Sequence, residues 1–153
     1  MLLSFLSSLR PMYQDDEIAL MLSPEDVRDP ALGIDDGYTF NIYLRRPRRR
    51  IGYVSLRIGE SPALYYLGHI GYRIEAEFRG HGYAARACAL MMPLMRDLQL
   101  KSVCITANPE NVPSRKTCEK LGCQLESIPA VPPAYQAMCG GARFKCRYIL
   151  TLS

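Results

Sequence analysis

The sequence predicts a mixed α/β fold in which helices and strands form layers around a single sheet. Two observations support this. Segments of strand-like composition occupy both ends of the chain, and two segments with helical patterns, 83–98 and 111–122, interrupt them. The chain has 153 residues, of which 48% are hydrophobic and 22% charged, so we expect one globular domain, residues 1–153, with a sizeable core.

The expected strands are short segments that are rich in β-branched and aromatic residues or continuously apolar. They cover residues 17–23, 38–46, 51–58, 67–76, 102–108 and 144–152. The second and third flank the turn "RRPRRR" and should pair as a hairpin. The fifth is continuously apolar and should be buried on both of its faces.

The two expected helices carry signals that shape them. In segment 83–98, Pro93 should kink the helix, because proline removes one backbone hydrogen bond and crowds the preceding turn. Segment 111–122 should begin with Asn111 as its N-cap and end at Gly122.

Charge, cysteines and the N-terminus narrow the class of protein. A net charge of +4 favours an anionic partner without requiring nucleic acid. The six cysteines form no C-x-x-C pair and no metal-ligand spacing with the two histidines, so we expect reduced thiols in a cytoplasmic protein and no metal. The start "MLLSFLSSLRPM" lacks the features of a signal peptide, so we expect a packed or frayed terminal segment and no membrane span.

The stretch "FRGHGYA", Phe78–Ala84, lies between an expected strand and an expected helix. Free backbone N–H groups and the helix dipole make such a helix start an anion-binding geometry. Gly80 and Gly82 permit positive φ and close approach of a phosphate, and Arg79 can add a charge-assisted contact. The ordinary alternative is a tight turn that binds nothing.

Two other motifs match part of this stretch. Gly80, Gly82 and Ala85 satisfy the dinucleotide pattern G-x-G-x-x-G/A, with Glu110 as a candidate ribose ligand. That fold needs several βαβ units, and the remaining chain is too short for them. The RNA-binding signature R-G-x-G-Y lies within a strand, whereas here the segment continues as a helix. Neither motif fits its surroundings.

"GYRIEAEFRGHGYAARA", together with "ANPENVPSRKTCEKLG", resembles the GNAT superfamily of N-acetyltransferases. The first stretch matches the acetyl-CoA motif [Q/R]-x-x-G-x-[G/A] at Arg79, Gly82 and Ala84. The second matches N-x-x-N-x-x-S…K-L-G at Asn108, Asn111, Ser114, Lys120, Leu121 and Gly122. The sequence is most similar to the branch of ribosomal-protein N-terminal acetyltransferases, and the resemblance is firm over residues 67–127.

The resemblance implies a mostly antiparallel central sheet with splayed strands and flanking helices, and acetyl-CoA as cosubstrate. It places the pyrophosphate on the amides of Arg79, Gly80, His81, Gly82, Tyr83 and Ala84. It makes the backbone of Ile74 the contact nearest the thioester. The Asn111 side chain should contact the pantetheine arm, and Ser114 should lie beside it.

Acetyl transfer to an amine needs a base for the ammonium, a donor for the oxyanion and a proton for the departing thiolate. Glu75 lies on the polar side of its expected strand near the loop, and we expect it to act as the base through water. The ordinary alternative is a solvated carboxylate paired with Arg73. His69 shares that face and is the second candidate.

The general acid departs from the usual family pattern. Many members have a tyrosine seven residues after the asparagine, and here that position is Cys118. In the branch that this sequence resembles, the serine of the motif has that role, which implies Ser114. The ordinary alternative for Ser114 is a residue that satisfies backbone groups in the first helical turn. Cys118 is expected to be a small buried residue.

The acceptor site also departs from the pattern. The resemblance implies two helices where only residues 24–37 are available, so either the acceptor site is open or a second subunit closes it, as a homodimer would. Segment 128–142 is a candidate replacement for part of the wall. The run Arg45–Arg50 is either a solvated hairpin tip or a docking site for RNA, a ribosome or an acidic acceptor.

The function predicted from the resemblance is an N-acetyltransferase that moves an acetyl group from acetyl-CoA to a primary amine. The acceptor is expected to be a small molecule or a protein N-terminus, and neither nucleic acid nor a membrane is an expected partner. The alternative is a non-catalytic module that binds CoA or nucleic acid. The cysteine in place of the usual tyrosine, the shortened acceptor wall and the arginine run support that alternative.

Overall fold

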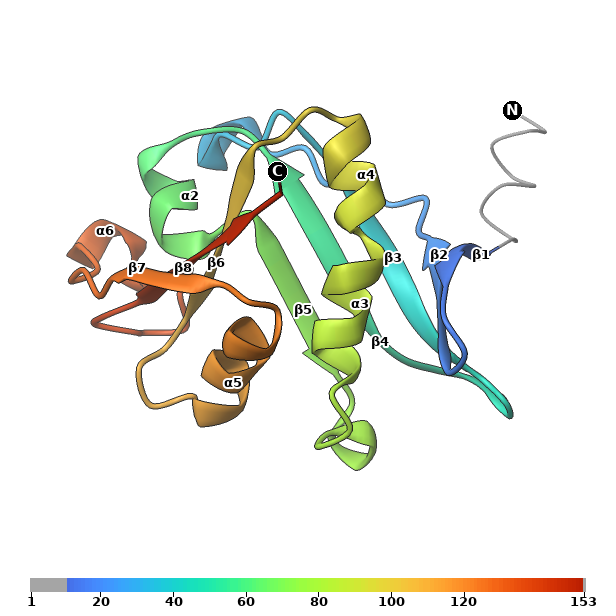
Figure 1. Cartoon of the computed structure of the whole chain (residues 1–153). Coiled ribbons are helices and arrows are strands. Elements are labelled where there is room, and N and C mark those ends of the chain that lie inside the picture. The colour runs from blue at the N-terminus through green and yellow to red at the C-terminus, as the bar shows by residue number, and fades with distance from the viewer. Residues whose placement is uncertain (1–10, 153) are drawn as a thin grey trace.

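The computed structural model describes residues 11–152, so the expectation for the N-terminal segment falls mostly outside the described residues. Over this range, eight strands form one sheet in the order β1-β2-β3-β4-β5-β6-β8-β7 (Figure 1). The strands are β1 (Pro11–Gln14), β2 (Ile18–Leu22), β3 (Asp36–Arg45), β4 (Arg48–Ile58), β5 (Ile70–Ile74), β6 (Ser102–Ala107), β7 (Gln124–Ser127) and β8 (Cys146–Thr151). The mixed, mostly antiparallel sheet with flanking helices confirms the expected fold class.

Strands β3 and β4 form the predicted hairpin, with Phe40 opposite Val54 in an antiparallel register. The turn is shorter than "RRPRRR" suggested, because Arg48, Arg49 and Arg50 already belong to β4. An arginine side chain in a strand lies along the sheet and can contact neighbouring elements. Most of the run is therefore part of the sheet.

Helices α3 (Tyr83–Leu90) and α4 (Met92–Asp97) cover one face of the sheet (Figure 1). The expected kinked helix is in fact two helices, because Pro93 lies in the first turn of α4, where its missing N–H costs nothing. Both helices pack on the same core cluster, in which Ala87 and Met91 are fully buried with Phe40 of the sheet.

Strands β5 and β6 run parallel but pair only once, at Ile70 and Ile105. Beyond that pair they diverge toward the glycine loop and helix α5 (Val112–Lys120), as Figure 1 shows. On its other side, β6 pairs with β8 from Ser102 to Ala107. The splayed strands that the resemblance implied are present, and they divide the sheet into two halves with a gap between them.

Two strands and two α-helices were not expected from the sequence: β1, β7, α2 (Pro62–Leu67) and α6 (Pro133–Gln136). The start of α2 had a signal, since Ser61 accepts a hydrogen bond from the Leu64 N–H at 3.0 Å and a proline follows it. Segment 128–142 packs on α2, where the rings of Tyr66 and Tyr135 stack 5.7 Å apart. No helix within residues 11–152 is both long and apolar enough to cross a membrane.

Candidate active site

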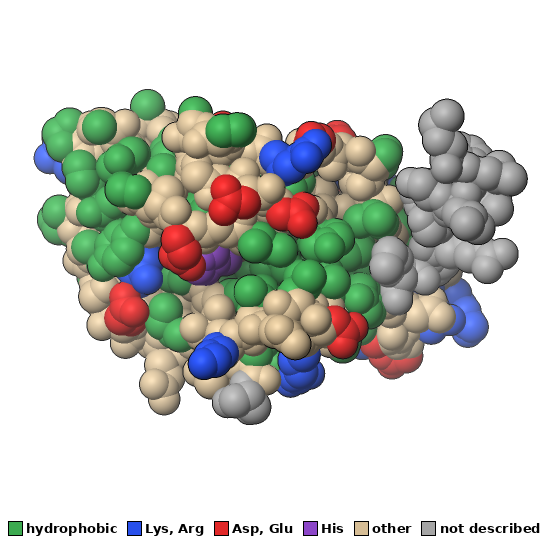
Figure 2. Space-filling view, turned by 90° about the horizontal axis from the view of Figure 1, so that it is seen from above, with side chains coloured by type: hydrophobic (Ala, Val, Ile, Leu, Met, Phe, Trp, Pro, Cys, Tyr) green, Lys and Arg blue, Asp and Glu red, His purple; other side chains and the backbone are tan. Residues whose placement is uncertain are grey.

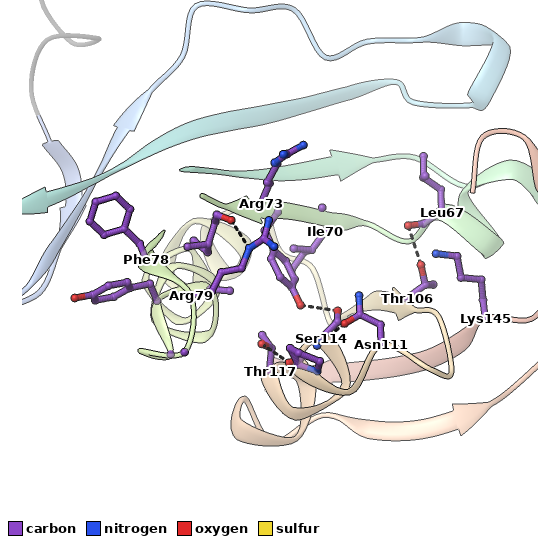
Figure 3. A pocket seen from close by; sticks show the side chains of 18 of the residues that line it. Leu67, Ile70, Arg73, Phe78, Arg79, Thr106, Asn111, Ser114, Thr117 and Lys145 are labelled. Atoms are coloured by element: carbon purple, nitrogen blue, oxygen red, sulfur yellow. Dashed lines mark hydrogen bonds between the residues drawn. The ribbon is translucent and has the colours of Figure 1, made fainter. Parts of the chain in front are cut away.

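A cavity of about 540 Å³ occupies the gap between the two halves of the sheet (Figure 3). Its wall combines β5, the glycine loop, β6 and the first turns of α5, with Arg57 from β4 and Lys145 next to β8. The wall includes most of the residues that the resemblance assigned to acetyl-CoA, which are Ile74, Arg79, Gly80, Gly82, Tyr83, Ala84, Asn111 and Ser114. His81 of the same loop is exposed and is not part of the wall.

The glycine loop begins helix α3 without a side-chain cap. Gly80 and Gly82 have φ of +86° and +76°, the left-handed region that glycine adopts without strain. The N–H groups of the first turn therefore remain free at the positive end of the helix. Arg79 turns back over the end of β5, where its Nε donates a hydrogen bond to the Ile74 carbonyl oxygen at 2.8 Å.

A lysine lies over this loop. A Cβ added at Gly82 would be 2.7 Å from the Lys120 Nζ, so the ammonium of α5 faces the loop across the groove between α3 and α5. Lys120 and Lys116 also line a neighbouring hollow of about 690 Å³ that includes both glycines. Lys120 belongs to the K-L-G motif, but the sequence offered no sign that its charge would meet the glycine loop. Amides, helix dipole and lysine together fit a pyrophosphate.

Tyr72 and Ser114 meet inside the cavity, with their hydroxyl oxygens 2.7 Å apart (Figure 3). Ser114 is positioned by the N-cap, since its N–H donates to the Asn111 Oδ1 at 3.2 Å. Burial raises the pKa of the Tyr72 phenol to about 12, so the phenol stays protonated at neutral pH. Tyr72 was not among the site residues predicted from the sequence.

Cys118, at the position of the usual tyrosine, is fully buried in the core. Its interaction with the Cys123 thiol, together with burial, raises its pKa, so it remains a thiol. This agrees with the expectation of a small buried residue. All six cysteines are free, and every one except Cys123 is buried. Residues 11–152 hold no group of three or more histidine, cysteine or acidic side chains placed to bind a metal.

The two candidate bases lie outside the cavity wall. Glu75 Oε1 is 3.7 Å from Nη1 of Arg50, the partner that replaces the expected Arg73. Arg49 and Glu77 form a second ion pair close by, with Nη2 and Oε1 2.6 Å apart. The hairpin arginines therefore brace the segment between β5 and the glycine loop. The role of Glu75 as a base stays a prediction.

His69 lies at the other end of β5, where its ring has two partners. Its Nδ1 accepts a hydrogen bond from the Cys104 N–H at 2.9 Å, and its Nε2 is 3.2 Å from Glu60 Oε1. The ring lines a separate depression of about 390 Å³. Figure 2 looks down on this end of the sheet, where acidic side chains surround a histidine. The structure does not bring His69 together with Ser114 or the glycine loop.

A sequence profile of the acetyltransferase (GNAT) domain matches residues 9–124. Because this match covers most of the chain, the chain belongs to the GNAT acetyltransferase family. Comparison with curated protein sequences gives no match.

Solved structures of acetyltransferases share the fold. The microcin C7 self-immunity acetyltransferase MccE, in complex with acetyl-CoA and AMP, aligns with a TM-score of 0.65 at 18% identity, over 94% of this chain and 98% of its own. Ribosomal-protein-S5-alanine acetyltransferase from Vibrio fischeri gives 0.61 at 23%, over 76% of this chain and 62% of its own. A GNAT acetyltransferase from Bacillus anthracis gives 0.59 at 20%, over 74% of this chain and 66% of its own. The chain thus spans about two thirds of the length of the last two.

Members of this family take their acetyl group from acetyl-CoA, and the cavity fits that molecule. A Cβ would fill the space over Gly82, where a pyrophosphate can approach the amides and Lys120. Within residues 11–152, β5 makes no further pairing with β6 beyond Ile70. Apart from the Ile74 carbonyl, which accepts from Arg79, its backbone groups on that side can pair with the amides of a pantetheine arm. Both observations support the residues that the resemblance assigned to the cosubstrate.

Proposed function

We propose that the chain is an N-acetyltransferase that moves an acetyl group from acetyl-CoA to a primary amine. The observation that carries this proposal is the cavity between β5 and β6, which has the uncapped glycine loop at one end. The cavity is bordered by side chains from both faces of β5, since Tyr72 and its neighbour Arg73 point to opposite sides. Two reactants can therefore meet in the gap from opposite faces of the sheet.

When bound, acetyl-CoA supplies an activated thioester. The loop amides and Lys120 bind its phosphates, while the backbone of Ile74 and the side chain of Asn111 orient its arm. Holding the reacting groups in place converts a bimolecular step into an effectively unimolecular one.

Ser114 is the proposed proton donor to the departing thiolate, and Tyr72 supports it. Either hydroxyl can donate in this pair. In the proposed arrangement the protonated phenol donates to the Ser114 oxygen, which leaves the serine hydrogen free to point into the cavity. A tyrosine from β5 thus takes the place of the tyrosine that α5 lacks at position 118. Because a thiol has an ordinary pKa near 8.5, the thiolate leaves without large assistance, and this donor is expected to contribute modestly.

Glu75 is the proposed base, and it acts from outside the cavity wall through water. Its carboxylate is 42% exposed and in contact with Arg50, so a water chain has access to it. An amine acceptor with a pKa near 10 is mostly an ammonium at neutral pH and must lose a proton before it attacks.

The proposed acceptors are small amines and protein N-termini. The relatives with ribosomal-protein substrates in their names support protein N-termini, and the short segment between β2 and β3 supports an accessible site. A nucleic-acid-binding module has less support, because four of the hairpin arginines are engaged within the chain. Arg45 donates to the Asp15 carbonyl, Arg48 stacks on Tyr43, and Arg49 and Arg50 pair with glutamates.

Calorimetry and turnover test the proposal in sequence. CoA and acetyl-CoA should bind with similar affinity, and NAD should show no comparable binding. Release of free CoA thiol is then followed with a panel of small amines, polyamines, aminoglycosides and peptide N-termini. Absence of CoA binding by the folded protein would rule the proposal out, and CoA binding without turnover across the panel would favour the non-catalytic alternative.

A further inference from the structure

Two cationic side chains line the end of the cavity that lies away from the glycine loop. Arg57 is on β4, and its guanidinium donates from Nη1 to the carbonyl oxygen of Gly68 at 3.0 Å. Lys145 stands beside Leu67 and Thr106, across the cavity from Phe78 and Arg79 (Figure 3). Neither side chain forms part of the acetyl-CoA contacts described above.

Arg57 lies on the sheet face opposite to helix α3. Its neighbour Leu56 is fully buried in the core beneath the helices, so strand alternation directs Arg57 to the other face. Gly71 makes room for it, since a Cβ at position 71 would overlap the guanidinium. Within residues 11–152, Nη2 and Nε of Arg57 make no hydrogen bond, and two of its donor groups remain available.

Lys145 is the second charge. Burial lowers its pKa, and the nearby positive charge of Arg57 adds to this effect. Glu110 acts in the opposite direction, but it is not within ion-pair distance of Lys145. In the part of the chain that the structure describes, neither Arg57 nor Lys145 forms a salt bridge with a carboxylate.

Two partly desolvated cations that face one cavity without a carboxylate destabilise the empty site and favour an anion. We propose that Arg57 and Lys145 form an acceptor subsite for an anionic group, and that the acceptor is a small amine carrying a carboxylate or a phosphate close to its amino group. This inference rests on the proposed acetyl transfer, because it identifies the second substrate of the same cavity. The short distance between amine and anion follows from the size of the cavity, about 540 Å³, which also has to hold the arm of acetyl-CoA.

Arg57 also has a structural role, since it binds carbonyl groups at the end of α2 and fills the space over Gly71. Lys145 has no such role, because none of the described residues accepts a hydrogen bond from its ammonium. Lys145→Met is therefore the decisive variant: it keeps the length of the side chain and removes its charge. Lys101→Met is its matched control, because Lys101 is exposed at the start of β6 and lies outside the cavity.

The experiment compares acceptor pairs that differ in one anionic group. Glycine is paired with glycinamide for the carboxylate, and O-phosphoethanolamine with ethanolamine for the phosphate. The readout is kcat/KM for the anionic acceptor divided by kcat/KM for the neutral acceptor. This ratio in wild type is compared with the same ratio in each variant, so that differences in intrinsic amine pKa cancel. We expect Lys145→Met to lower the anionic preference by about 10- to 100-fold, as expected for a charge-assisted hydrogen bond, with the change mainly in acceptor KM.

The acceptor pair whose anionic preference falls more in Lys145→Met shows whether the natural anionic group is a carboxylate or a phosphate. Equal ratios in wild type, Lys145→Met and Lys101→Met would overturn the inference. Arg57→Met should act in the same direction, with thermal melting to detect any loss of fold.

A binding measurement separates this inference from the proposed function. Calorimetry with N-acetylglycine and N-acetylglycinamide, with and without CoA, reports the subsite without turnover. Binding of the anion that disappears in Lys145→Met, in a protein that does not bind CoA, would reject acetyl transfer and retain the anionic subsite. Equal affinity for the two probes would reject the subsite alone.

Discussion

The two ends of the cavity are built from different parts of the chain. At the glycine-loop end, the proposed binding groups are mainly backbone amides of consecutive residues, Arg79 to Ala84, at the start of one helix, with the Lys120 ammonium facing them. At the other end the proposed binding groups are side chains from separate elements, Arg57 and Lys145, with Tyr72 between the two ends. A site of consecutive backbone groups leaves a local pattern in the sequence, whereas a site of converging side chains depends on strand pairing.

The charges at the two ends also differ in kind. The start of α3 has a partial positive charge that comes from the backbone and does not titrate in the ordinary pH range. Arg57 and Lys145 carry full charges whose pKa values are lowered by burial. Changes at the loop glycines should therefore act through space and backbone conformation, and changes at Arg57 or Lys145 through charge.

The largest effect should come from the loop end. Gly82→Val should weaken CoA binding by at least about 100-fold, because a Cβ occupies the approach to the amides, displaces Lys120 and strains a residue with φ of +76°. Calorimetry measures the affinity. Gly140→Val is the matched control, since Gly140 has φ of +65° and no neighbouring atom within 4 Å. If both variants bind CoA as wild type does, the loop does not hold the pyrophosphate.

Replacing Glu75 tests whether the base lies outside the cavity wall. Glu75→Gln should lower kcat by roughly 100-fold with little change in CoA affinity, and the loss should shrink at high pH, where the acceptor is already neutral. The pH profile of kcat is the measurement. Arg50→Met, which removes the partner of Glu75 without removing the carboxylate, should have a much smaller effect. A small, pH-independent loss in Glu75→Gln would mean that Glu75 only pairs with Arg50.

The pair between the two ends should give an intermediate effect. Ser114→Ala should lower kcat by about 10- to 100-fold, and Tyr72→Phe by somewhat less, with CoA affinity nearly unchanged. Because the two hydroxyls act as one unit, the double variant should lose little more than Ser114→Ala alone. Cys118→Ala should leave kcat almost unchanged, with thermal melting as the control for a buried site. Additive losses in the double variant would mean that Tyr72 and Ser114 act independently. A large loss in Cys118→Ala with full activity in Ser114→Ala would assign the proton donor to Cys118 in place of Ser114.

The smallest expected effect concerns stability at alkaline pH. The pKa of Tyr72 is raised from 10.0 in the unfolded chain to about 12 in the folded protein, so only the unfolded state loses this proton in the interval between them. The contribution of Tyr72 is therefore fully present below pH 10 and is lost as the pH rises toward 12. Tyr72→Phe should flatten this part of the decline in the free energy of unfolding, measured by urea titration. Parallel curves for wild type and variant would show that the phenol is not held in its protonated form by burial.

Local pattern was sufficient wherever neighbouring residues act together. The Asn111 cap, the strand alternation of β5 and the hairpin β3–β4 follow from adjacent residues, and so does the glycine loop at the start of α3. The likeness of two short motifs to the GNAT family was enough to predict the fold and its splayed strands. The interruption of the helix at Pro93 was also predicted, although Pro93 lies at the start of a second helix where a kink was expected.

Tertiary structure decided which distant side chains meet. Tyr72 and Ser114 are far apart in the sequence, and only the packing of α5 against β5 brings their hydroxyls to 2.7 Å. Two arginines of the hairpin form ion pairs with glutamates beside the glycine loop. His69 instead contacts Glu60 and accepts a hydrogen bond from the Cys104 backbone. Backbone conformation is governed by steric contacts between near neighbours, so the sequence by itself determined the loop and the caps. Side-chain encounters depend on register and on the divergence of β5 from β6, which only the folded chain establishes.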